Sequence, residues 1–74
     1  MDKFNRASAE ERLSGLYLGK LIQFNPIVVG YTPVMGRIDS IAVENFTGTP
    51  VVIFFINNKR YSIDYEYFED SIEG

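Results

Sequence analysis

The hydrophobic pattern of the C-terminal half predicts a β-hairpin. Residues 51–56 form an uninterrupted apolar run. Within residues 59–65, Tyr61, Ile63 and Tyr65 alternate with the polar Ser62 and Asp64, as in a half-buried strand. Between them stand Asn57 and Asn58, a residue type that tolerates the positive φ of a tight two-residue turn. The two segments are therefore expected to pair as antiparallel strands.

An amphipathic pattern near the N-terminus predicts a short helix over residues 8–18. Ser8 and Glu11 have the spacing of a capping box, in which each residue's side chain bonds the backbone amide of the other. The apolar residues that then share one helix face are Leu13, Leu16 and Tyr17. Gly19 follows as a left-handed stop, so the helix is expected to end just before it.

The segment between this helix and the hairpin predicts two more strands. Residues 20–24 alternate, and Asn25 with Pro26 ends that strand and opens a long loop over residues 25–36. The apolar alternation of residues 37–46 slips by one position near Ser40, which indicates a β-bulge. A turn over residues 47–50 leads into the hairpin.

The end of the chain predicts one last helical turn. Asp64 stands where an N-cap is needed, and Tyr65, Phe68 and Ile72 recur at the spacing of one helix face. The chain is thus mainly β, with a short N-terminal α-helix, four or five antiparallel strands and a C-terminal helical turn.

This order of elements resembles the SH3-like small β-barrels. The sequences that carry the resemblance are GKLI at 19–22, GRIDSI at 36–41 and FFINNKRY at 54–61. The resemblance covers residues 19–68 and implies a small barrel, without naming one family or a function. We expect a single domain over residues 1–74: a flexible N-terminus at 1–7, the helix at 8–18, the barrel at 19–68 and an acidic tail at 69–74.

The run at residues 51–56 is apolar on both faces, whereas its partner strand is apolar on one. One face lines the core, and the other needs a cover of its own to avoid an aggregation-prone surface. The N-terminal helix is the economical cover, and a second copy of the protein is the alternative.

Composition argues against catalysis. The 74 residues include no His, Cys or Trp, so the commonest metal ligands, thiol and imidazole chemistry and disulfides are missing. A deep two-carboxylate cleft is also hard to build at this length. We therefore expect no enzyme activity, cofactor or metal. Without an apolar leader or membrane-length segment, a cytoplasmic location without membrane contact is expected.

The net charge of −3 is unevenly distributed. Residues 1–60 carry seven basic and five acidic side chains, whereas residues 61–74 carry five acidic and no basic ones. An acidic end repels phosphate and favours a basic protein surface. Glu66, Glu69 and Asp70 are the residues expected to dock on it.

Two further groups of residues are candidates for binding. Tyr31 lies in the long loop between glycine and proline positions, where an exposed ring can stack on a base or enter a partner's pocket. At the hairpin end, Asn58, Lys59 and Arg60 form a polar, cationic group. Arg37 together with Arg60 has the chemistry to clamp a phosphate or carboxylate.

Three functions fit these features. The first is a non-catalytic interaction protein, of the kind found among phage and mobile-element accessory proteins, that inhibits a host protein with a basic surface. The second is a homo-oligomer that sequesters a small nucleotide signal between its protomers. The third, a nucleic-acid-binding barrel, is disfavoured by the acidic net charge.

Overall fold

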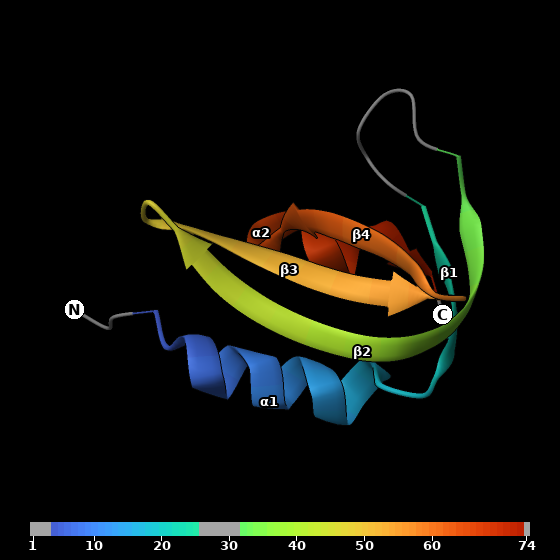
Figure 1. Cartoon of the computed structure of the whole chain (residues 1–74), viewed down its shortest axis with the longest axis horizontal. Coiled ribbons are helices and arrows are strands. Elements are labelled where there is room, and N and C mark those ends of the chain that lie inside the picture. Colours follow the sequence, from blue (N-terminus) through green and yellow to red (C-terminus); the bar gives the residue numbers. More distant parts are fainter. Residues whose placement is uncertain (1–3, 26–31, 74) are drawn as a thin grey trace.

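The computed structural model describes residues 4–25 and 32–73 (Figure 1). Its elements, in chain order, are α1 (Arg6–Tyr17), β1 (Leu21–Phe24), β2 (Val34–Phe46), β3 (Thr49–Ile56), β4 (Lys59–Asp64), α2 (Tyr65–Phe68), the 3-10 turn η1 (Glu69–Ser71) and β5 (Ile72–Glu73). The predicted class, a mainly β fold with an N-terminal helix and a C-terminal helical turn, is confirmed.

The strands form one antiparallel sheet in the order β4-β3-β2-β1-β5, which curls into a half-barrel (Figure 1). The long strand β2 makes the curl possible, because it pairs with β1 through residues 34–37 and with β3 through residues 38–46. Its register shifts between Ile38 and Ser40, which confirms the predicted bulge. At Gly36 a Cβ atom would come within 2.5 Å of Ile56 Cγ2, so this position needs glycine for close packing.

The hairpin turn has the predicted backbone. Asn57 and Asn58 have φ values of 54° and 65°, the left-handed pair that a two-residue turn between twisted strands requires. The turn between β2 and β3 is tighter than expected: only Thr47 and Gly48 lie in it, and β3 already begins at Thr49. Both turns therefore link neighbouring antiparallel strands directly.

The ends of the helical segments differ from the prediction. α1 begins at Arg6, because Asn5 is its N-cap and accepts a hydrogen bond from the Ser8 backbone at 3.0 Å; Ser8 is not the cap. Asp64 precedes α2 but makes no side-chain cap bond. Residues 72–73, expected within an acidic tail, instead pair with β1 as β5.

The core lies on the inner face of the curled sheet. The buried apolar residues are Ala9, Leu13, Ile22, Phe24, Ile38, Ile41, Val43, Val52, Phe54, Ile56, Ile63 and Phe68. Phe54 is at the centre of an aromatic cluster: its ring centroid lies 4.9 Å from that of Phe24 and 5.2 Å from that of Phe68. Large rings thus supply much of the apolar burial that so small a domain needs.

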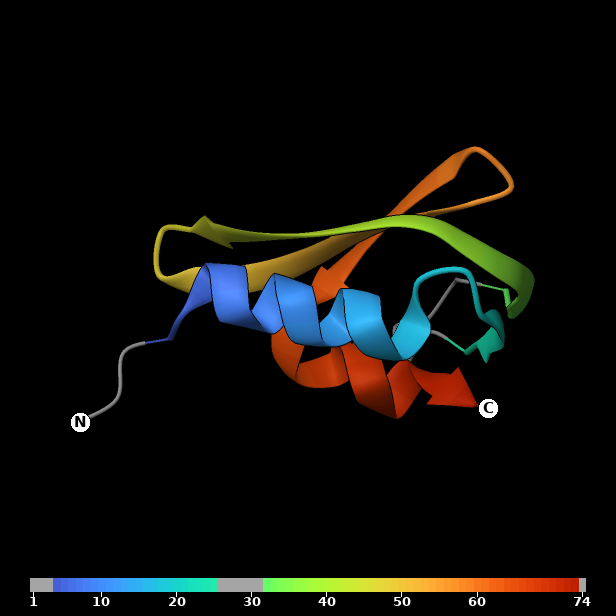
Figure 2. The ribbon, with the colours of Figure 1, turned by 90° about the horizontal axis from the view of Figure 1, so that it is seen from below.

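The expectation that the N-terminal helix covers the second face of residues 51–56 is wrong. Ala9 and Leu13 of α1 join the buried cluster that contains Val52 and Phe54, on the inner face. Figure 2 shows α1 and α2 on the same side of the sheet. The opposite side of β3 is left without a helix.

An unpaired edge of β2 explains the position of α1. Beyond residue 37, β1 no longer pairs with β2, and α1 lies along the edge that is exposed there. Glu10 Oε1 accepts a hydrogen bond from the Val43 amide at 2.8 Å, and Arg6 Nη1 donates to the Val43 carbonyl at 3.1 Å. Unsatisfied edge groups are costly, so a helix that bonds them and also closes the core is favoured over one placed on the opposite face.

Candidate functional site: the outer face of the sheet

The uncovered side of strands β2, β3 and β4 carries three rows of side chains. Directly paired residues share a face, so the register defines these rows. The first row is Ser40, Phe55 and Arg60; the second is Ala42, Ile53 and Ser62; the third is Glu44, Val51 and Asp64. These nine residues are called the outer face below.

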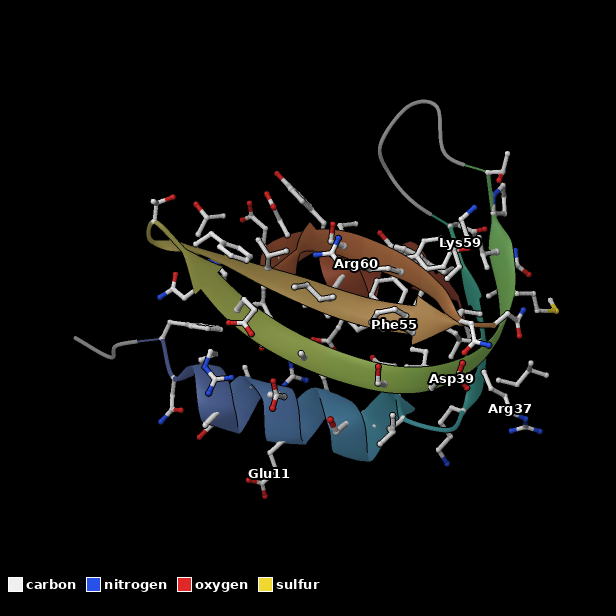
Figure 3. All side chains as sticks on the ribbon, viewed as in Figure 1. Glu11, Arg37, Asp39, Phe55, Lys59 and Arg60 are labelled. Carbon is white, nitrogen blue, oxygen red and sulfur yellow. The ribbon has the colours of Figure 1, made fainter. Side chains whose placement is uncertain are left out.

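The middle of the outer face is apolar. Val51, Ile53 and Phe55 are partly exposed and do not belong to the buried cluster or to the residues packed against it. Phe55 lies on the side of the sheet that carries no helix (Figure 3). Phe46, the next residue of β2 in the same alternation, is 54% exposed. An apolar strip therefore runs along β3 and continues to Phe46 at the end of β2.

The two ends of the outer face differ in charge. Arg60 stands in the first row, and Glu44 and Asp64 stand in the third. None of the three forms an ion pair with a described residue. Their charges are thus available to a partner.

The hairpin-end candidates are exposed but do not converge. Arg37 Nη1 donates to the Gly19 carbonyl at 3.0 Å, and in Figure 3 its side chain extends past the sheet margin, away from Arg60 over β4. Lys59 Nζ lies 5.9 Å from the centre of the Tyr61 ring. Asn58 occupies the turn itself, with its backbone in the left-handed region. Tyr31 lies outside the described residues.

Glu69 forms hydrogen bonds with other residues of this chain. Arg12 donates to both of its carboxylate oxygens, at 2.7 and 3.3 Å, and the Tyr17 hydroxyl donates to it at 3.0 Å. The bonds from Arg12 hold the pKa of Glu69 below its ordinary value, while burial and the bond to Glu69 raise the pKa of Tyr17. Glu69 therefore ties α1 to η1.

The other two acidic candidates are exposed and lie on successive short elements. Glu66 is in α2 and Asp70 is in η1, and neither hydrogen-bonds to another described side chain. Tyr67 between them is 45% exposed. Of the three predicted docking carboxylates, these two have no described internal partner.

A hollow of ≈ 310 Å³ lies where the turn between β2 and β3 meets the start of α2. Its lining residues are Gly48, Thr49, Pro50, Asp64, Tyr65 and Glu66. This volume is at the small end for ligand pockets, and two carboxylates in its wall disfavour a phosphate. Within residues 4–25 and 32–73, no group of three carboxylates is placed to hold a metal ion.

Comparisons with protein-family models, curated proteins and solved structures give no match for this chain. Among the helices of the described ranges, none is long and apolar enough to cross a membrane. The function of the outer face is therefore inferred from its own residues and geometry.

Only part of this site could be recognised from the sequence. A run that is apolar on both faces indicated a surface in need of cover, and it is the surface found. Asp64 and Glu44 were not recognised as its rim, because only the register of β2, β3 and β4 places them beside Val51.

Proposed function

We propose that this chain is a non-catalytic interaction protein whose binding surface for another protein chain is the outer face. One observation carries the proposal. Strand β3 has apolar residues on both sides, and the described helices cover only the inner side. Contiguous exposed apolar surface with a polar rim is typical of protein–protein contact sites.

The residue types on the outer face support a protein as the ligand. Phe55 in the first row is a large ring with Arg60 beside it, and aromatic and arginine side chains are enriched at the energetic centres of interfaces. The face lies on a rigid sheet rather than on a loop, so little ordering entropy is lost on binding. A partly apolar surface on the outside of a curled sheet, without a deep pocket, matches another protein better than a small molecule.

A narrower version of this function concerns a host protein with a basic surface, inhibited by an accessory protein of a phage or mobile element. Glu66 and Asp70 are the exposed carboxylates for such a contact, whereas Glu69 is engaged with Arg12. A test of this version requires the host protein itself.

The two other functions have less support. A nucleotide clamp needs Arg37 and Arg60 to converge, and their side chains point apart (Figure 3). A nucleic-acid surface needs a basic stripe, and the net charge is −3. The outer face, with Glu44 and Asp64 at one end, does not provide such a stripe.

The proposal is tested by site-specific photo-cross-linking in intact cells. A photo-reactive phenylalanine analogue replaces Phe55 on the outer face or, as the matched control, Glu11, which is exposed on α1 and points away from the sheet (Figure 3). We expect a discrete cross-linked protein product from position 55 and none from position 11. No product at position 55, or the same product from both positions, contradicts the proposed surface.

A further inference from the structure

We propose that the partner of the outer face is a second copy of this chain, packed sheet to sheet about a two-fold axis. The inference rests on the proposed function, since it names the occupant of that same surface. Its basis is that the pattern of the outer face is complementary to itself.

The charges of the outer face are arranged in opposite rows of one strand. On β4, Arg60 stands in the first row, opposite Phe55, and Asp64 stands in the third row, opposite Val51. The uncharged row of Ala42, Ile53 and Ser62 lies midway between them. A rotation that exchanges the first and third rows therefore exchanges a cation with an anion.

A two-fold axis in the plane of the interface, perpendicular to the strands and passing over the middle row, performs this exchange. It places Arg60 of each copy against Asp64 of the other, and Phe55 against Val51, with Ile53 facing its own equivalent. Each contact occurs twice, as in an isologous dimer. Face-to-face antiparallel sheets pack with their strands within about 30° of alignment, which is compatible with this arrangement.

The other in-plane axis, parallel to the strands, is disfavoured by charge. It exchanges β2 with β4 and keeps each row opposite itself, so that Glu44 faces Asp64 of the other copy twice. Like charges set against each other in a partly apolar contact are costly. The charge pattern thus selects one of the two simple symmetric arrangements.

The size of the outer face sets the expected affinity. Three strands about 4.8 Å apart and a span of five residues of about 3.3 Å each give a face of roughly 14 by 16 Å. The area buried per copy is then below the roughly 800 Å² of a standard interface. We expect a weak dimer with a micromolar dissociation constant, present at high protein concentration and lost on dilution.

The test is a charge swap followed by analytical ultracentrifugation of the full chain. Arg60→Asp sets two carboxylates against each other at each contact, and Asp64→Arg sets two guanidinium groups against each other. Each variant alone is expected to weaken dimerisation by at least about tenfold. Mixing the two variants restores both opposite-charge contacts, so an equimolar mixture is expected to form a heterodimer of wild-type affinity.

Two controls distinguish loss of the proposed contact from misfolding and from a change in net charge. Asp64 makes no capping bond and Arg60 no described ion pair, so both variants are expected to fold, which circular dichroism and the urea midpoint verify. Glu11→Arg changes the net charge as much as Asp64→Arg but lies on α1, and it is expected to leave the dissociation constant unchanged.

The proposal is overturned by a wild-type chain that stays monomeric at high concentration, by charge variants that dimerise normally, or by a mixture that fails to recover the dimer. These outcomes differ from a failure of the proposed function. A cross-link from position 55 to a protein other than this chain supports the binding surface and rejects the second copy, whereas no cross-link rejects both.

Discussion

The role of Glu69 is set by its tertiary contacts and not by its position in the sequence. In the sequence it is one of five carboxylates in an acidic end. In the structure it accepts hydrogen bonds from Arg12 and Tyr17, which lie 57 and 52 positions earlier in the chain. Its charge is therefore used to hold α1 against η1 and is less available to a partner than those of Glu66 and Asp70.

This contact predicts a pH dependence of stability. The pKa of Glu69 is lowered from its ordinary value of 4.5 by the bonds from Arg12. A carboxylate with a lowered folded-state pKa stabilises the fold above its unfolded-state pKa, and that contribution is lost as the pH falls through the folded-state pKa. Because the pair is substantially exposed, we expect Glu69→Gln to cost only about 0.5–1 kcal/mol at neutral pH.

Urea unfolding at a series of pH values checks this. Glu69→Gln should lose most of its deficit relative to the wild type at pH values well below 4.5, because the wild-type carboxylate is then protonated as well. Glu66→Gln, which removes an exposed carboxylate of α2, is the matched control and should track the wild type throughout. Equal curves for the two variants would contradict the role of Glu69.

At the scale of elements, α1 both packs against the core and covers the edge of β2 that β1 leaves unpaired. Only Ala9 and Leu13 of its apolar positions are buried, and Leu16 of the predicted stripe is 49% exposed. Tyr17 packs beside Phe68, and polar contacts complete the attachment: Glu10 and Arg6 bond the backbone of Val43, and Arg12 and Tyr17 bond Glu69. The helix thus needs a narrower apolar stripe than one lying over a sheet face.

This placement predicts unequal effects of two leucine truncations. Leu13→Ala removes a fully buried side chain and should cost about 2–4 kcal/mol of unfolding free energy, through lost burial and the cavity left behind. Leu16→Ala on the same helix should change stability by less than about 0.5 kcal/mol. Urea denaturation compares them, and similar losses would mean that both residues face the core.

At the scale of the whole molecule, strand β3 has one face in the packed core and its other face on the outer face, which no described helix covers. Phe54 is fully buried among Phe24, Tyr61 and Phe68, whereas Phe55 next to it is partly exposed on the outer face. Successive strand residues point to opposite faces, so neighbouring phenylalanines serve different purposes. Phe54 stabilises the fold, and Phe55 is available for association.

Alanine substitution at each position separates these roles. Phe54→Ala should cost about 3–5 kcal/mol, enough to unfold so small a domain at least partly. Phe55→Ala should cost about 1 kcal/mol or less, mainly through strand propensity, while weakening self-association. Thermal unfolding of dilute monomer and sedimentation at high concentration measure the two effects. A large loss of monomer stability in Phe55→Ala would place Phe55 in the core.

The sequence by itself determined the local features of this protein. Positive φ at Asn57 and Asn58, the slip of alternation near Ser40 and the helical turn after Asp64 depend on residues within a few positions of one another, and each was predictable. The tertiary structure decided which face α1 covers, that Glu69 meets Arg12, and that Arg60 and Asp64 mark opposite ends of one face. These depend on strand register and on competition among distant groups for burial and hydrogen bonds, which no local pattern encodes.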